Sequence, residues 1–371
     1  MNFSLKYFQK LDWFLIALVA LLITTGLVLI YSTSFKADQD PDFNNFIRQI
    51  IYAIVGLGLM FGVAVFNYRG LRNITNYLYI FSVLSLTTVL ILGKTISGST
   101  RWIDLGVFHF QPSEITKLIL IIVLAKYLSD HLHEMKFFRH LLLSGVYVAI
   151  PMVLVLLEPD LGTALSYAII WIVMLTIAGV RSLYLLLVGV GIGGIIPLAW
   201  NFILKDYQKE RLISFLNPQS DPLGSGYNVV QSTIAIGSGR ILGRGLGYGP
   251  QSHLNFLPVQ YTDFVFAVLA EELGFLGGMF LLLLFGLLLW RILKIALKSP
   301  DNFGRLLGIG ILTVTIFQIL VNIGMNLGIM PVTGIPLPFV SYGGSALLFS
   351  MLALGIILSI GVNKEKIEFN K

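Results

Sequence analysis

The sequence has no cysteine and few charged residues. Without a thiol in its 371 residues, the chain has no disulfide bridge, thiolate metal site or cysteine nucleophile. Asp, Glu, Lys and Arg make up 12% of the chain, hydrophobic residues make up 56%, and the mean hydropathy is +0.85. A typical soluble domain carries roughly 25% charged residues. The composition therefore excludes an ordinary water-soluble protein and predicts a chain embedded in a membrane.

A polar linker, a cleavable signal peptide and a continuous basic face are also missing from the sequence. The first apolar run is too long for a signal peptide, and further apolar runs follow it. The Lys and Arg residues, which give a net charge of +6, occur in small groups between apolar runs, so we expect no nucleic-acid partner. We predict a single polytopic membrane domain over residues 1–371.

Ten apolar runs have about the length, 18 residues, that crosses the hydrocarbon core of a bilayer. They cover residues 11–32, 49–66, 74–92, 113–128, 141–157, 161–179, 182–203, 264–289, 306–330 and 345–360. The predicted fold is an all-α integral membrane protein of about ten transmembrane helices, with a large extracytoplasmic loop, residues 204–262, between helices 7 and 8. This loop is rich in Tyr, Phe, Leu and Ile, so we expect short helices over the outer surface.

The basic residues predict the orientation of the chain. With the N-terminus in the cytoplasm, every inside segment has at least one Lys or Arg, whereas the short outside links near Pro159 and between Pro331 and Ser341 have none. This asymmetry is the one that the positive-inside rule describes. We therefore predict that both termini are cytoplasmic.

Ionisable side chains near the outer ends of the spans are the candidates for chemistry, because a charge inside a membrane is costly unless it is paired or hydrated. Glu114 and Lys117 share one helix face, where they could contact substrate or form a structural salt bridge. Glu158 and Asp160 bracket Pro159 at the junction of two spans, and the alternative role for Asp160 is a helix N-cap.

Three further acidic residues occur at the start of the eighth span. Asp263 begins the span, where a helix N-cap is again the alternative to a functional role. Glu271 and Glu272 lie two turns deeper. At least one of these two must find a buried partner or line a cavity, since an isolated buried carboxylate is strongly disfavoured.

Two irregular stretches could contact a ligand. The glycine-rich residues 236–247 could bind phosphate through backbone amides, although the strand and helix of a nucleotide-binding motif are not evident around them. Arg211, Arg240 and Arg244 nearby favour an anionic headgroup at the outer face. The proline-rich residues 331–338 cannot form a regular helix, so at membrane depth they must line a cavity or pack inside the protein.

Four motifs, in this order along the chain, resemble the SEDS family of cell-wall polymerases. They are residues 101–106 with 110–114, residues 159–163, residues 262–264 with 271–274, and the run from Asn322 through Gly328, Pro331, Gly334, Pro336 and Pro338 to residues 341–345. The likeness spans nearly the whole chain. Four ordered motifs on a plan of ten spans are far more specific than a lone glycine motif.

The resemblance implies a peptidoglycan glycosyltransferase. Such an enzyme polymerises lipid II into β-1,4 glycan strands at the outer face of the bacterial cytoplasmic membrane and releases undecaprenyl pyrophosphate. It implies lipid II and the growing lipid-linked glycan as ligands, and a class B penicillin-binding transpeptidase and other elongation-machinery membrane proteins as partners. Met325, Asn326 and residues 334–338 resemble the elongation member more than the division paralogue. Ala346 departs from the Ser or Thr that often follows Gly343-Gly344-Ser345 in the family.

Carried over residue by residue, the resemblance makes Asp263 the catalytic carboxylate. Glu114 and Asp160 lie in its motifs and are expected to contact substrate. The pyrophosphate charge would be met by the cationic groups on the outer side, which are Arg101, Lys117, Arg211, Arg240 and Arg244. No tightly bound cofactor is expected, although a divalent cation, Mg²⁺ or Mn²⁺, would help to meet this charge.

Two rival functions remain from the sequence. A flippase or transporter for the same lipid would also have broken helices and buried carboxylates, but it would need charges toward both leaflets. A non-catalytic scaffold for cell-wall proteins would need none of the acidic residues. The ionisable groups within the predicted spans gather toward the outer half, which favours chemistry at the outer face.

Overall fold

A computed structural model of the protein describes residues 9–35, 41–96, 99–104, 109–202, 206–216, 226–254 and 256–363. Its long helices are α2 (Trp13–Ser32), α3 (Asn44–Val65), α4 (Leu71–Leu92), α5 (Pro112–Asp130), α6 (Phe138–Leu157), α7 (Leu161–Ile177), α8 (Ser182–Phe202), α12 (Val265–Leu297), α13 (Asn302–Asn326) and α14 (Gly344–Asn363). Two 3-10 turns, η1 (Tyr68–Gly70) and η2 (Leu132–Glu134), join α3 to α4 and α5 to α6. Each predicted apolar run thus coincides with a helix.

The chain is a multi-pass helical membrane protein. Seven helices of the described part are long and apolar enough to cross a membrane. Two more, α7 and the start of α8, form shorter apolar helices, and α5 carries Glu114 and Lys117 in its first two turns. The number of ten spans stays a prediction. The helix α12 ends at Leu297, eight residues beyond the predicted end of its span, so the sequence underestimated its length.

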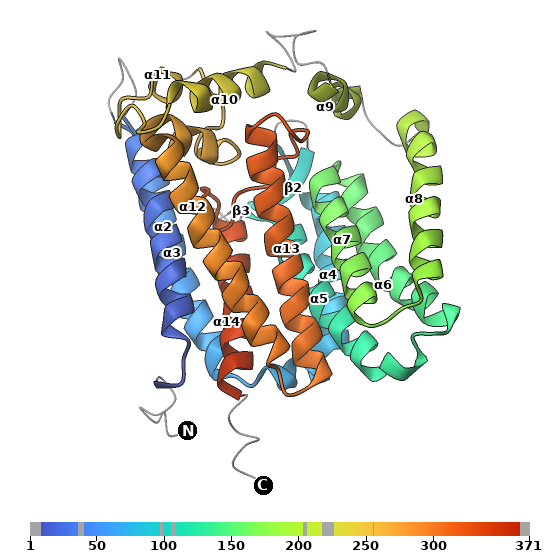
Figure 1. Ribbon diagram of the computed structural model, residues 1–371. Coiled ribbons are helices and arrows are strands. Elements are labelled where there is room, and N and C mark those ends of the chain that lie inside the picture. The colour runs from blue at the N-terminus through green and yellow to red at the C-terminus, as the bar shows by residue number, and fades with distance from the viewer. Residues whose placement is uncertain are drawn as a thin grey trace.

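The helices run side by side, with α13 and α14 at the centre of the bundle (Figure 1). Of their apolar windows, 83% and 78% of residues are buried, against 22% in the windows of α3 and α4. Small residues allow α13 to approach its neighbours: a Cβ added to Gly308 would lie 2.6 Å from the Ala296 Cβ on α12, and one added to Gly310 would lie 2.5 Å from Ile121 on α5. Close helix packing through glycine is typical of membrane proteins.

Short elements cover one end of the bundle. The helices α9 (Asp206–Leu216), α10 (Tyr227–Ser238) and α11 (Pro250–His253) lie across the end opposite to the start of α2 and the end of α14 (Figure 1). This confirms that the predicted loop 204–262 contains short helices, within the part of it that the structure describes. We call residues 226–254 the covering segment.

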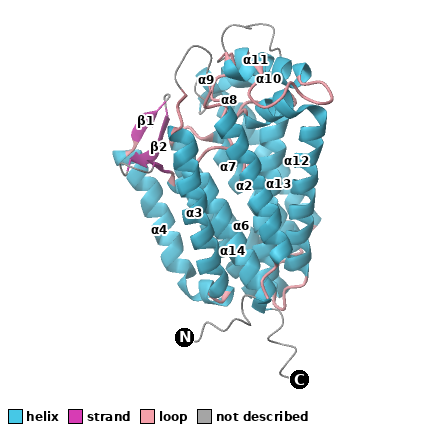
Figure 2. Cartoon of the chain, turned by 90° about the vertical axis from the view of Figure 1, so that its left-hand side faces the viewer, coloured by secondary structure: helices cyan, strands magenta, loops and turns pink. Residues whose placement is uncertain are grey.

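A small antiparallel sheet adds to the all-α plan at the same end. Its strands, in the order β1 (Lys94–Ile96), β2 (Ser99–Asp104) and β3 (His109–Phe110), extend from the end of α4 (Figure 2). The sequence did not predict this sheet, because strands of 3, 6 and 2 residues are too short to give a recognisable alternation of apolar and polar residues.

The chain between α13 and α14, residues 327–343, is irregular, and its residues 335 and 337–341 are buried; we call it the α13–α14 loop. A Cβ added to Gly26 of α2 would lie 2.4 Å from the carbonyl oxygen of Val340. From α3, the Gln49 amide donates to the Ser341 carbonyl (3.2 Å) and accepts from the Gly343 N–H (3.3 Å). These contacts confirm that irregular backbone here packs inside the protein.

We expect Gly26→Ala to destabilise the protein, because the new methyl group would meet the backbone of the α13–α14 loop. Overpacking of this kind costs about 1 to 3 kcal/mol. The midpoint of thermal unfolding in detergent would measure it. Gly62→Ala on α3 is the control, since a Cβ there meets no atom within 4 Å. Equal midpoints for the two variants would contradict the close approach of α2 to the loop.

Candidate functional site

Asp263 lies immediately before α12 and does not cap it. The helix begins at Val265 with Phe264 as its N-cap residue. Asn326 of α13 takes over the capping role: its Oδ1 accepts from the Ala267 N–H at 3.1 Å, while its Nδ2 donates to the Asp263 carbonyl at 2.9 Å. Because a side chain from another helix caps α12, the N-cap alternative for Asp263 is wrong.

The backbone around Asp263 is fixed to α13 and to the α13–α14 loop. The Asn322 amide donates both to the Asp263 carbonyl (3.1 Å) and to the Ile335 carbonyl (2.8 Å). The Ser341 hydroxyl donates to the Thr262 carbonyl at 2.6 Å. Side-chain amides and a hydroxyl therefore satisfy carbonyl groups of non-helical backbone and join three segments that are distant in sequence.

The Asp263 carboxylate faces the α13–α14 loop. A Cβ added to Gly334, which is exposed and has a φ of +74°, would lie 3.7 Å from Asp263 Oδ2. On the other side of the loop, a Cβ added to Gly162 of α7 would lie 3.0 Å from the Ile335 side chain and 3.2 Å from the Thr333 Cβ. The start of α7, the loop and the partly exposed Asp263 thus meet at one place.

Asp160 and Arg101 organise the link between α6 and α7. The Asp160 carboxylate accepts from the Thr163 N–H (3.1 Å) and hydroxyl (2.9 Å), so its predicted N-cap role is confirmed. An Arg101 guanidinium nitrogen on β2 lies 3.7 Å from Asp160 Oδ2. Arg101 also donates to the carbonyls of Glu158 and Pro159. Arg101 therefore fixes the position of this link.

Glu158 is a buried carboxyl to which the sequence assigned no role. Its side chain is fully buried, and neither carboxyl oxygen has a hydrogen-bond partner among the described residues. Burial, with a further contribution from the charge of Asp160, raises the pKa of Glu158 to about 8, although Arg101 opposes this shift. This shift favours the protonated form of Glu158 near neutral pH. The sequence could not predict that Glu158 is buried, because its burial depends on contacts between distant segments.

Glu114 and Lys117 form a buried salt bridge. Lys117 Nζ lies 2.7 Å from Glu114 Oε1, and the two side chains are 2% and 4% exposed. The Lys117 ammonium also lies 5.4 Å from the centre of the Phe349 ring. The Tyr167 hydroxyl of α7 donates to the Ser113 carbonyl at 3.0 Å, which joins the start of α5, beside this pair, to α7. Of the two predicted roles, the structure shows the salt bridge.

The glycine-rich run packs against a break in α12. The break is at Gly274, with φ of 65° and ψ of −164°. A Cβ added to Gly243 would lie 2.1 Å from the Glu272 carbonyl oxygen, so a side chain there is sterically excluded. The Arg244 and Gly245 N–H groups donate to α12 carbonyls at 3.0 and 2.9 Å. Because these two N–H groups are bonded to α12, they are not available to bind phosphate. At Gly243 and Gly245 the glycines allow close backbone packing instead of the predicted phosphate contact.

Both deep carboxylates on α12 have partners in or near the covering segment, as predicted for at least one of them. Glu271 accepts from two N–H groups of α11, at 2.8 and 3.1 Å. Glu272 accepts from the Ser32 hydroxyl (2.5 Å), the Gly247 N–H (3.2 Å) and the His253 ring (3.1 Å). The hydrogen bond to Glu272 raises the pKa of His253. The two carboxylates hold the covering segment to the bundle.

The predicted cations occupy two environments. Lys117 is buried and Arg101 is partly buried in the polar network, whereas Arg240 and Arg244 are exposed on the covering segment. The backbone of Arg211 lies in α9, and its side chain is outside the described part of the structure. Within the described residues, no group of three or more His, Asp or Glu side chains is arranged to hold a metal ion.

Comparisons with known proteins place the chain. The family model of the FtsW, RodA and SpoVE proteins, described as "Cell cycle protein", matches residues 12–366. Stage V sporulation protein E of Bacillus subtilis is 39% identical over 358 residues, which are 94% of this chain and 96% of that one. Peptidoglycan glycosyltransferase MrdB of Escherichia coli K12 is 39% identical over 354 residues, 95% of this chain and 94% of that one.

A solved structure supports the same conclusion. A chain in a peptidoglycan synthase complex, solved to explain how polymerization and crosslinking are coordinated, matches with a TM-score of 0.80 and 36% identity over 95% of this chain and 98% of that one. The family match covers nearly all of the chain, and the four motifs lie where its irregular backbone and buried carboxylates meet. The chain belongs to the FtsW/RodA/SpoVE family, the SEDS family that its motifs resemble.

Proposed function

We propose that the protein is a peptidoglycan glycosyltransferase that polymerises lipid II, with Asp263 as the catalytic base. The observation that carries this proposal is the setting of Asp263. The amides of Asn322 and Asn326 donate to its backbone carbonyl, and Asn326 also accepts from the first turn of α12. Its partly exposed carboxylate faces Gly334. Relatives named peptidoglycan glycosyltransferase support the reaction class.

The chemistry requires a single inverting displacement. The donor sugar is linked to undecaprenyl pyrophosphate in the α configuration, and the glycan product is β-1,4 linked. The 4-hydroxyl oxygen of the acceptor N-acetylglucosamine bonds to the donor anomeric carbon as the bond to pyrophosphate breaks. The hydroxyl proton passes to the Asp263 carboxylate, as it does from water to the base of inverting glycosidases. No covalent sugar intermediate is needed, which agrees with the absence of cysteine.

The position of the acidic groups favours an enzyme over a flippase. Glu114 lies in the first turn of α5, Glu158 follows the end of α6, Asp160 caps the start of α7, and Glu271 contacts the covering segment. All of these groups lie at the end of the bundle that α9, α10 and α11 cover (Figure 1). Asp12 and Asp301, toward the other end, are only partly buried. Alternating access would need fully buried carboxylates there as well.

We further propose that the protein is the elongation member of the family in the bacterial cytoplasmic membrane and works with a class B penicillin-binding protein. Met325 and Asn326 support the elongation assignment, and Asn326 is the residue that caps α12. The similarity to a chain of a complex that coordinates polymerization and crosslinking supports the partner. The division paralogue is the alternative, and complementation of strains depleted of either protein would separate them.

A divalent cation, Mg²⁺ or Mn²⁺, remains part of the proposal. Mg²⁺ is often held by one or two carboxylates together with substrate phosphates. Asp263 is the partly exposed carboxylate that could contribute such a ligand. The ion would supply positive charge to the departing pyrophosphate. Assays with and without a chelator would test whether it is required.

Polymerisation of lipid II by the purified chain, alone and with its transpeptidase, tests the main proposal. A glycan product supports the glycosyltransferase. Movement of lipid II across vesicle membranes, with no polymer from the same sample, would identify a flippase instead. If the folded protein neither polymerised lipid II nor moved it across the membrane, the result would support a non-catalytic scaffold.

We expect Asp263→Asn to fold, insert and bind its transpeptidase but to lose polymerisation by about 10² to 10⁴ fold, the usual contribution of a general base. Asparagine keeps the shape of the side chain but cannot take the proton. Asp42→Asn, an exposed carboxylate between α2 and α3, is the control and keeps the normal rate. Near-normal glycan synthesis by Asp263→Asn would refute the assignment and direct attention to Asp160 or Glu114.

The cationic residues give an independent test. We expect Arg101→Ala to lower polymerisation by about 10² fold, because the variant loses positive charge for the pyrophosphate and the contacts that fix the α6–α7 link. We also expect Arg240→Ala to slow polymerisation. Because Arg240 is exposed, the level of expression should not change. Arg181→Ala, in the link between α7 and α8, is the control. Normal rates for all Ala variants of Arg101, Lys117, Arg211, Arg240 and Arg244 would make this account wrong.

The proposed topology is testable by labelling, since the chain has no cysteine of its own. Tyr248→Cys, at a side chain that is 78% exposed on the covering segment, should react with a membrane-impermeant maleimide on intact cells. Arg181→Cys should react only after permeabilisation, and tags at Asn2 and Lys371 should both report the cytoplasm. A C-terminal tag outside the cell would mean that the spans are miscounted.

A further inference from the structure

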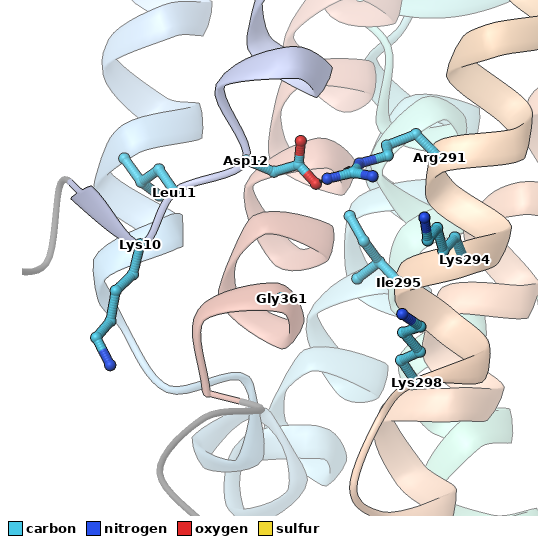
Figure 3. Close-up of a pocket in the computed structure, with 8 residues that line it drawn as sticks. All are labelled: Lys10, Leu11, Asp12, Arg291, Lys294, Ile295, Lys298 and Gly361. Carbon is cyan, nitrogen blue, oxygen red and sulfur yellow. Dashed lines mark hydrogen bonds and ion pairs between the residues drawn. The ribbon is translucent and has the colours of Figure 1, made fainter.

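A basic cavity lies at the end of the bundle opposite to Asp263. Its volume is about 230 Å³, and it is bounded by the start of α2, the last turns of α12 and Gly361 of α14. Figure 3 shows Arg291, Lys294 and Lys298 one after another along α12, with Asp12 on the facing chain turned toward Arg291 and the Lys10 side chain directed away from α12. Three cationic side chains of α12 therefore line the cavity with one carboxylate.

The cations on α12 share one helix face, because Arg291, Lys294 and Lys298 follow the spacing i, i+3 and i+7. Arg291 Nε donates to Asp12 Oδ2 at 2.6 Å, which neutralises one charge and fixes the wall of the cavity. The Lys294 ammonium lies 4.8 Å from the centre of the Trp290 ring. Lys298 has no ion-pair partner among the residues described here. The lining thus keeps a net positive charge.

The cavity is next to an aromatic surface of the kind found at membrane interfaces. Trp13, Phe14 and Trp290 are 54%, 45% and 50% exposed, and they flank the residues that pair α2 with α12. Exposed Trp rings beside cationic groups are typical of the headgroup level of a bilayer. The cations and the aromatic rings therefore lie together where the polar and apolar parts of a phospholipid meet.

Two simpler roles do not explain the cavity. Cations at this end of the chain direct membrane topology, and Lys294 and Lys298 offset the partial negative charge at the C-terminus of α12. Either role is fulfilled by cations that point into open water. Neither requires that three cations of one helix face and a carboxylate of a separate segment line one hollow beside exposed aromatic rings.

We propose that this cavity binds the phosphate headgroup of an anionic phospholipid. Ammonium and guanidinium groups suit phosphate oxygens, and basic pockets between membrane helices bind such headgroups. Lys294 and Lys298 donate to the phosphate, while the Arg291–Asp12 pair keeps α12 and α2 at a fixed separation. The acyl chains lie along the exposed rings of Phe14 and Trp290. This site is independent of the proposed polymerase activity.

The test is a lipid titration of the purified full chain in a neutral detergent at low ionic strength, followed by native mass spectrometry. The probes are phosphatidylglycerol, phosphatidylcholine and inorganic phosphate. We expect tight retention of phosphatidylglycerol alone. The double variant Lys294→Gln/Lys298→Gln should bind it about 25-fold more weakly, on the basis of about fivefold for each cation at the membrane surface.

The matched control is Lys136→Gln/Arg181→Gln, which removes the same charge from exposed positions in the α5–α6 and α7–α8 links. The control should bind phosphatidylglycerol as the wild type does. Equal losses in the two variants would show general surface attraction and overturn the proposal. Wild-type affinity in the pocket variant, equal binding of phosphatidylcholine, or displacement of the lipid by equimolar inorganic phosphate would overturn it as well.

Discussion

The structure depends on the need to satisfy backbone polar groups where the chain leaves the helical conformation at membrane depth. Lipid offers no water for this purpose, so the protein must supply the hydrogen bonds. The α13–α14 loop receives them from Gln49 and Asn322, and the close approach of Gly26 leaves no room for solvent. Asn322 also donates to the carbonyl of Asp263, as does Asn326, one turn further along α13. The constraint that makes the loop possible therefore also positions the proposed catalytic carboxylate.

Buried carboxylates obey the same requirement elsewhere at this end of the bundle. Glu271 is satisfied by backbone N–H groups of α11, and Asp160 by the first turn of α7. Local donors therefore hold these two carboxylates in place. Asp263 differs because Asn326 caps its helix in its place and because its carboxylate is partly exposed. The partial exposure of this carboxylate beside Gly334 supports its proposed functional role.

The sequence predicted well what depends on local composition, and less well what depends on tertiary contacts. Apolar runs predicted the long helices because the length of a span is set by the membrane. The motif at Asp263 suggested chemistry, but local sequence could not reject the N-cap alternative, since the capping Asn326 lies 63 residues away. The break at Gly274 and the burial of Glu158 likewise arise from contacts between distant segments. The short sheet lacked a pattern long enough to detect.

The pairing of α2 with α12 connects the two ends of the molecule. At one end the Ser32 hydroxyl donates to Glu272, and at the other Arg291 donates to Asp12. About 20 residues separate the two contacts along each of the two helices, which corresponds to roughly 30 Å, the thickness of a hydrocarbon core. Polar contacts between α2 and α12 are thus placed near both membrane interfaces, where their polar groups cost least, and apolar packing joins the helices between them. A phospholipid bound beside Arg291 would therefore act on the same helix pair whose other end is joined to the covering segment through Glu272.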